Sequence, residues 1–285
     1  MLLPRSFGRK VFDAFESRGQ LCVGVDAHAS LLDHWGLDDD VNGLDYFANS
    51  VIDAAEGLVG LVKPQVSFFE RHGSAGFAVL ERITHRAKDA ELIVIADAKR
   101  GDIGSTMEAY LDAWLGENSH FYADTLTVSP FLGLETSTAL MGQHLENGKG
   151  ITVLVATSNP EGAGLQTART ESGESIAAEL WGKLEKLNQI SSAPGDRIGS
   201  FAAVVGATLH FKRFGLELEQ SGVKTPILAP GFGAQGAGLR DIRLIFGEAA
   251  GNVIASVSRS VLEVGKQGLT EAIKRANDEL AKGLG

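Results

Sequence analysis

The chain has 285 residues, of which 44% are apolar and 22% charged, and acidic residues outnumber basic ones by 36 to 26. This composition excludes disordered and fibrous classes, and a net charge of −10 without a basic stripe argues against nucleic acid or an anionic membrane as a partner. No stretch approaches the roughly 18 uninterrupted apolar residues of a membrane span, and the first residues lack the apolar region of a signal peptide. The single cysteine, Cys22, excludes an internal disulfide and fits a reducing compartment. We therefore expect a cytoplasmic protein.

Eight short apolar runs predict strands, spaced as strand, crossover helix and next strand would be. They begin at Leu21, Leu61, Leu92, Phe121, Ile151, Phe201, Pro226 and Asn252. Amphipathic stretches at 44–58, 75–90, 107–115 and 239–248 predict helices between them. Because the runs are nearly continuous in apolar residues, they are typical of a parallel sheet buried on both faces. A doubly wound open sheet also fits, but eight units without an interior linker favour a single-domain (β/α)8 TIM barrel over residues 1–285.

The widest interval between predicted strands follows the fifth strand. It contains the polar stretch "NPEGAGLQTARTESGE", a predicted helix from Ile176, and "SSAPGD". We interpret residues 159–200 as an insertion on the C-terminal face, where barrel enzymes bind substrate. It could shield the site or serve only surface contacts.

The third predicted strand ends in "ADAKRGDIGST", which carries the strongest chemical signal. Alternation places Asp97 and Lys99 on one face of the strand, pointing into the barrel mouth, and Asp102 follows on the loop. Ser105 and Glu108 have the spacing of a capping box for the next helix. A purely structural Asp and Lys pair is the simpler alternative, but charges so close together at the end of an apolar strand are costly to bury without a purpose.

A second lysine, Lys63, ends the second predicted strand in "GLVKPQ". By itself it reads as a surface residue, but neighbouring strand ends in a barrel bring it within reach of Asp97. With Lys99 and Asp102 the group then has two charges of each sign, so it can be buried without net charge. We predict these four residues to be catalytic.

A glycine-rich loop follows the seventh predicted strand. In "APGFGAQGAG", Gly231, Gly233 and Gly236 have GxGxxG spacing, but the next strand ends in "SVSRS" and not in the acidic residue that a dinucleotide site requires. Together with Ser258 and Arg259, this loop predicts the phosphate site that many barrels have after strands seven and eight. The glycines could also serve only as turns.

Asp26 ends the first predicted strand, where it could accept hydrogen bonds from a sugar hydroxyl or cap the next segment. The seven histidines show no metal-ligand spacing, so we predict no metal site. Neither a GxSxG nor a P-loop pattern occurs, which leaves serine hydrolase and nucleotide kinase chemistry without support.

Taken together, these motifs make the chain resemble the orotidine 5′-phosphate decarboxylase family in its longer bacterial form, over nearly the whole length. The motifs are "VGVD", "VKPQ", "DAKRGD", "DIGST", "ATSNPEG", "PGFGAQG" and "VSRS". The resemblance implies decarboxylation of orotidine 5′-phosphate to uridine 5′-phosphate, without metal or cofactor, in a homodimer with sites at the interface. The family pattern implies that Lys99 donates the proton and that Asp102 is shared across the interface. It also implies substrate contacts by Asp26, Ile103, Thr106, Ser158, Gln235 and Arg259, to which the phosphate site predicted above adds Ser258.

Two alternatives remain at this point. Sugar-phosphate enzymes similar to hexulose-phosphate synthase share the D-x-K-x-x-D pattern but use magnesium and have an acidic ligand where this chain has Lys63. A silent barrel that senses a phosphorylated ligand would need the phosphate site but not the four alternating charges.

Overall fold

The barrel predicted from the strand pattern is present in a computed structural model of the chain, which describes residues 4–285. Within this range, parallel strands close into one barrel in sequence order. They are β1 (Leu21–Val25), β2 (Leu61–Pro64), β3 (Ile93–Arg100), β4 (Thr125–Val128), β5 (Gly150–Ala156), β6 (Phe201–Val205), β7 (Ile227–Ala229) and β8 (Val253–Val257). Pairing of β1 with β8 excludes the open sheet and confirms the predicted fold. The first three residues of the predicted domain lie outside the described residues.

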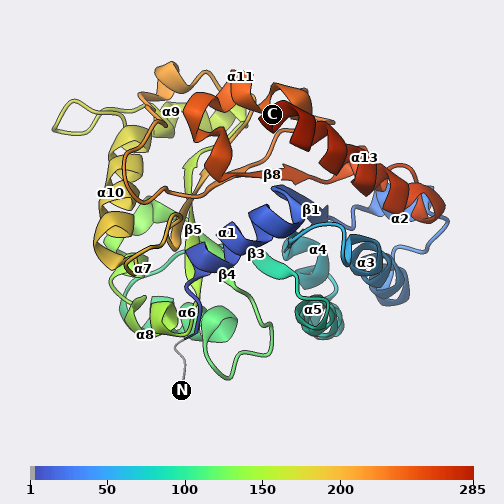
Figure 1. Ribbon diagram of the computed structural model, residues 1–285. Helices are drawn as coiled ribbons and strands as arrows, with labels where there is room; N and C mark the ends of the chain where they lie inside the picture. The colour runs from blue at the N-terminus through green and yellow to red at the C-terminus, as the bar shows by residue number, and fades with distance from the viewer. Residues whose placement is uncertain (1–3) are drawn as a thin grey trace.

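Helices surround the barrel and connect successive strands (Figure 1). The α-helices are α1 (Phe7–Arg18), α2 (Ala29–His34), α3 (Val41–Ala55), α4 (Ser67–Glu70), α5 (Gly73–Asp89), α6 (Gly104–Leu115), α7 (Glu135–Thr138), α8 (Gly142–Glu146), α9 (Ala163–Gln166), α10 (Ile176–Ser191), α11 (Ile242–Phe246), α12 (Arg259–Leu262) and α13 (Lys266–Leu284). The 3-10 helices are η1 (Pro130–Leu132), η2 (Pro160–Gly162), η3 (Phe211–Phe214), η4 (Leu239–Asp241) and η5 (Gly247–Asn252). The predicted helices at 44–58, 75–90 and 107–115 correspond to α3, α5 and α6, whereas the stretch at 239–248 is divided among η4, α11 and η5. In the part of the chain described, no helix is long and apolar enough to cross a membrane.

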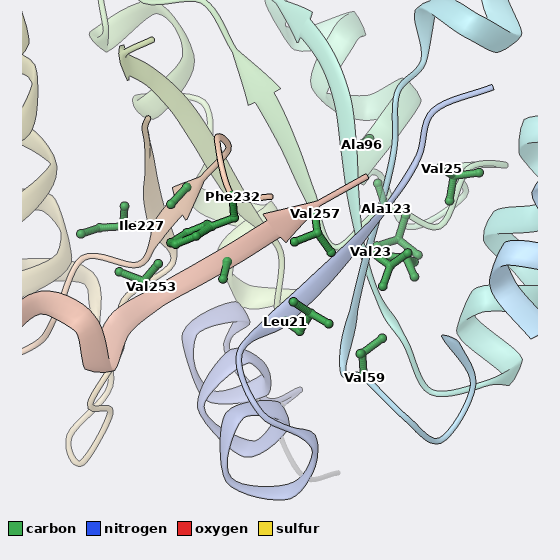
Figure 2. Packing of buried hydrophobic residues seen from close by; sticks show 14 of the residues in the cluster. Leu21, Val23, Val25, Val59, Ala96, Ala123, Ile227, Phe232, Val253 and Val257 are labelled. Atoms are coloured by element: carbon green, nitrogen blue, oxygen red, sulfur yellow. The ribbon is translucent and has the colours of Figure 1, made fainter. Parts of the chain in front are cut away.

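The apolar core has two layers, separated by the barrel wall. Figure 2 shows Leu21 and Val23 of β1 with Val253 and Val257 of β8 in the layer between the strands and the outer helices. Cys22, between the first two of these, belongs instead to the layer inside the barrel. Because successive side chains along a strand point to opposite faces, neighbouring residues enter different layers.

The interior is filled at the strand starts by α1, which crosses in front of the strands near the centre of Figure 1. Phe7 and Val11 are fully buried and belong to the inner layer. Gly8 permits this close approach, because a Cβ at its position would lie 1.8 Å from the carbonyl oxygen of Ile198. An apolar plug at the N-terminal end leaves the C-terminal end as the place for chemistry.

Two local predictions were wrong. The fourth strand begins at Thr125 and not at Phe121, because Tyr122 has φ 45° and the side chain of Asp124 accepts a hydrogen bond from the Val94 amide at 3.0 Å. The capping box is also absent. Helix α6 begins at Gly104, and its N-cap residue makes no side-chain cap bond, so Ser105 lies inside the first turn.

The segment between β5 and β6, interpreted above as an insertion, contains η2, α9 and α10. Helix α10 contacts both flanking strands, and its N-terminus is capped by Ser175, whose hydroxyl accepts from the Ala178 amide at 3.0 Å. The start of this segment therefore lies at the strand ends, and its helix lies against the wall.

Candidate active site

Charged residues replace apolar ones where the inner faces of the strands reach the C-terminal end. Leu61 of β2 and Ile95 of β3 belong to the inner apolar layer, and Lys63 and Asp97 follow two residues later on the same faces. Both charged side chains remain buried, with residue exposures of 7% and 8%. The predicted meeting of the two strand ends is observed: Lys63 Nζ lies 3.0 Å from Asp97 Oδ2.

Asp97 is the centre of this cluster because its carboxylate accepts from four side chains. Lys63 Nζ and Gln65 Nε2 donate to Oδ2 at 3.0 and 2.9 Å. Lys99 Nζ and Thr127 Oγ1 donate to Oδ1 at 2.6 and 3.1 Å. A carboxylate bonded so completely is held in a single orientation.

Lys99 differs from Lys63 in exposure and in backbone conformation. Its side chain is 45% exposed, against 9% for Lys63, so its ammonium can reach a bound molecule and solvent. Its φ is 50°, in the left-handed region that residues with a Cβ rarely adopt. The pairing of β3 with β4 shifts register between Ala96 and Arg100, which places Lys99 in a bulge. Bulges near active sites redirect side chains in this way.

The electrostatics keep the buried pair charged. Burial alone would lower the pKa of Lys63, but the carboxylates of Asp26 and Asp97 outweigh it and raise that pKa above its ordinary value. Burial would likewise raise the pKa of Asp97, yet Lys63 and Lys99 hold it well below its usual range. Both groups are therefore ionised at neutral pH.

The second carboxylate of the cluster within one chain is Asp26 and not Asp102. Asp26 Oδ1 lies 3.9 Å from Lys63 Nζ and is buried without a hydrogen-bond donor. Asp102 accepts from the Ile103 amide at 2.8 Å and makes no ion pair within residues 4–285. The expected balance of two positive and two negative charges is thus completed by Asp26 in place of Asp102. The role predicted for Asp102 requires a second chain.

A cavity of about 430 Å³ opens above the cluster. It joins Asp26 and Lys63 to the residues predicted for phosphate binding, Gln235, Ser258 and Arg259. The Ser258 hydroxyl is buried without a partner, and Arg259 is exposed. The remaining lining residues are His28, Ser30, Pro230, Gly231, Phe232, Ala234 and Ser256.

The glycine loop after β7 forms one wall of this cavity. Its turn is closed by the amide of Gly233, which donates to the carbonyl of Ala237 at 2.9 Å. Gly233 has φ 72°, and a Cβ there would lie 2.4 Å from Ser260 Oγ. Glycine is required at this position by both backbone conformation and space.

Six predicted site residues are not part of the cavity lining in a single chain: Asp97 and Lys99 of the charged cluster, Asp102, and three more that lie farther along the rim. Ile103 and Thr106, at the start of α6, and Ser158, just after β5, are all exposed. Ile103 is 60% exposed.

Sequence reasoning missed several residues at the site, four of which are polar and contact Asp97 or line the entrance beside Asp26. Gln65 and Thr127 bond to Asp97, and His28 and Ser30 line the cavity. Gln65 lies one residue beyond β2 and two residues after Lys63, so the alternation of side chains could have placed it on the same face. Nothing local marks Thr127, because only the pairing of β4 with β3 brings it to the cluster. Across residues 4–285, no three His, Cys, Asp or Glu side chains gather as metal ligands.

Comparison with known proteins places the chain among one group of enzymes. The family model described as orotidine 5′-phosphate decarboxylase / HUMPS family matches residues 19–275. The orotidine 5′-phosphate decarboxylase of Streptomyces coelicolor is 45% identical over 96% of this chain and 95% of its own length, and that of Salinispora arenicola is 44% identical over the same shares. A crystal structure of a candidate orotidine 5′-phosphate decarboxylase from Streptomyces avermitilis superimposes with a TM-score of 0.93 at 43% identity, covering 100% of this chain and 98% of that one.

Proposed function

The chain belongs to the orotidine 5′-phosphate decarboxylase / HUMPS family, and from this premise we propose how its charged cluster performs the reaction. The protein is a decarboxylase, a carboxy-lyase of pyrimidine biosynthesis. Its proposed reaction converts orotidine 5′-phosphate to uridine 5′-phosphate and carbon dioxide, without metal or cofactor. The observation that carries the proposal is the Asp97 carboxylate, buried and fixed between the ammonium groups of Lys63 and Lys99.

In this mechanism Asp97 lies against the carboxylate of the substrate, and Lys99 lies against C6 of the pyrimidine. The bond between C6 and the carboxyl carbon breaks, carbon dioxide leaves, and the electron pair remains at C6. The Lys99 ammonium stabilises that charge and donates its proton to C6. Since the Lys99 side chain is 45% exposed, it can regain a proton from water after product release.

The remaining site residues bind the rest of the substrate. Asp26 Oδ1, which lacks a donor, would accept a hydrogen bond from a ribose hydroxyl, and the Lys63 ammonium would donate one to a ribose oxygen. Gln235, Ser258 and Arg259 would bind the phosphate at the far side of the cavity. The binding energy of that remote phosphate could then close the glycine loop and exclude water from C6.

The site is completed by a second copy of the chain in this proposal. Asp102, with Ile103 and Thr106, would enter the partner's site, and Ser158 would contact the pyrimidine. Exposed apolar side chains on the same rim support such an interface. Phe131, directly after β4, is 75% exposed, and Ile103, after the neighbouring β3, is 60% exposed.

The family description also covers enzymes that act on other sugar phosphates, so the substrate is the point to test. A cation at Lys63 would repel a magnesium ion beside Asp97, which favours the metal-independent reaction. We expect loss of orotidine 5′-phosphate absorbance at full rate in excess chelator. No turnover with this substrate, or turnover restored only by magnesium, would contradict the proposal.

Subunit complementation tests the shared site. Lys99→Ala and Asp102→Ala subunits should each be inactive, but a heterodimer has one site with both defects and one with neither. Equal amounts refolded together form about half heterodimers, so roughly a quarter of wild-type activity should return. If dimers re-form without recovered activity, Asp102 acts within its own subunit.

A further inference from the structure

We propose that Thr127 is a positioning residue that aims the Lys99 ammonium at the reacting carbon. This inference rests on the proposed function, because it assigns the proton transfer to Lys99. Thr127 lies on β4 and is only 1% exposed, so a bound molecule has almost no surface of this residue to contact. Any effect on the reaction must therefore pass through the residues that it contacts.

The Thr127 hydroxyl forms hydrogen bonds with both Lys99 and Asp97. Its oxygen accepts a hydrogen bond from the Lys99 amide at 2.9 Å, and it donates to Asp97 Oδ1 at 3.1 Å. The carbonyl of Ala96 is a second acceptor at 3.4 Å, but the shorter bond to a charged carboxylate is the stronger one. A hydroxyl has one proton and two lone pairs, so both contacts can exist at once.

This link matters because the Lys99 backbone is in an unfavourable conformation. Ala96 pairs with Leu126 and Arg100 pairs with Val128, so three residues of β3 lie opposite Thr127 alone. A left-handed conformation at a residue with a Cβ persists only when its surroundings enforce it. The Thr127 hydroxyl supplies such a constraint at the bulge, directly on the amide of the residue concerned.

The same oxygen also fixes the partner of the ammonium. Lys99 Nζ lies 2.6 Å from Asp97 Oδ1, the atom to which Thr127 donates. The Thr127 hydroxyl thus holds the Lys99 backbone directly and the Lys99 side chain through Asp97. Displacing a reacting group by about 1 Å can cost roughly 100-fold in rate, so loss of these two hydrogen bonds should lower kcat.

The test compares three substitutions of buried threonines. Thr127→Val keeps the shape and removes the oxygen, and Thr127→Ser keeps the oxygen. Thr125→Val is the matched control, because Thr125 lies two residues earlier on β4, is fully buried, and bonds Thr152 at 2.9 Å outside the charged cluster. We expect Thr127→Val to lower kcat roughly 10- to 100-fold with KM within about 3-fold, while the other two keep kcat within about 3-fold.

Amide hydrogen exchange supplies a second readout. The Lys99 amide should exchange faster in Thr127→Val but not in Thr125→Val, even if both lower Tm equally. If Thr127→Val does not fold, Thr127→Ala takes its place with the same expected loss of kcat.

The outcomes separate this inference from the proposed function. Wild-type protein that does not decarboxylate orotidine 5′-phosphate overturns the proposed function. Active wild type with an unimpaired Thr127→Val overturns only the role of Thr127. An equal loss of kcat in Thr125→Val, or no recovery in Thr127→Ser, would also overturn it, because the effect would then be one of packing.

Discussion

The two ends of the barrel are built from the same strands but differ in whether the polar groups that line their cavities have hydrogen-bond partners. At the N-terminal end, Phe7 and Val11 fill the interior, and the charges around them have partners: Lys10 pairs with Asp124 at 2.9 Å, and Lys149 donates to a backbone carbonyl at 2.7 Å. At the C-terminal end, Asp26 Oδ1 and the Ser258 hydroxyl are buried without partners.

The difference cannot be read from cavity size. A cavity of about 590 Å³ lies at the N-terminal end, lined by Lys10, Asp124 and Lys149 among others, and it is larger than the cavity of about 430 Å³ at the C-terminal end. The unpartnered oxygens of Asp26 and Ser258, which line the smaller cavity, mark the functional end more reliably than volume does, because buried polar groups without partners cost stability and persist where a ligand uses them.

The largest difference between the two ends is expected when a lysine is replaced at each, Lys99 at the C-terminal end and Lys10 at the N-terminal end. Lys99→Ala should fold normally and lose roughly 10⁴-fold or more in kcat, because no other group supplies a positioned ammonium at C6. Lys10→Ala is the control, with kcat unchanged. Turnover and far-ultraviolet circular dichroism measure both variants. Retention of a tenth of wild-type kcat in Lys99→Ala would remove it as the proton donor.

A cavity mutation at the plug should have the opposite effect. Phe7→Ala should lower the free energy of unfolding by about 3 to 5 kcal/mol, because the ring is fully buried in the inner layer. The folded protein should keep its kcat. Ile190→Ala, on a side chain that is 80% exposed, should change stability by less than about 0.5 kcal/mol. A comparable loss in both variants, measured by denaturant unfolding, would mean that α1 does not plug the barrel.

Removing the phosphate contact should give a smaller catalytic effect. Arg259→Ala should lower kcat/KM by an amount worth about 2 to 4 kcal/mol, with a raised KM, because a charge-assisted bond to the substrate is lost. The matched substrate is orotidine, which has no phosphate and should be turned over equally by variant and wild type. Unchanged kinetics on the phosphorylated substrate would place the phosphate site elsewhere.

The smallest effect is expected at Cys22, inside the barrel between the two ends. Burial raises the pKa of its thiol to about 12, although Lys63 opposes this shift. A thiol with a raised pKa is protonated and unreactive at pH 8, so a disulfide reagent should leave the folded enzyme active and unmodified. Denatured protein should react with one equivalent. Modification with loss of activity in the folded state would show that the interior opens.

The sequence alone determined the architecture and three of the four charged residues of the cluster, Lys63, Asp97 and Lys99. Repeated apolar runs predicted the closed barrel, because a strand buried on both faces must avoid polar residues along its whole length. Alternation placed Asp97 on the inner face, and the adjacency of successive strands brought Lys63 to it. Both inferences depend only on the period of a strand and the order of the chain.

The tertiary structure decided which polar groups complete the cluster. Asp26 supplies the second carboxylate within one chain, and Thr127 bonds both Asp97 and the Lys99 amide. These contacts depend on the register between neighbouring strands and on the bulge that follows Ala96. Local sequence patterns specify the face of a strand but not its register against the next one, so geometry between strands could come only from the folded chain.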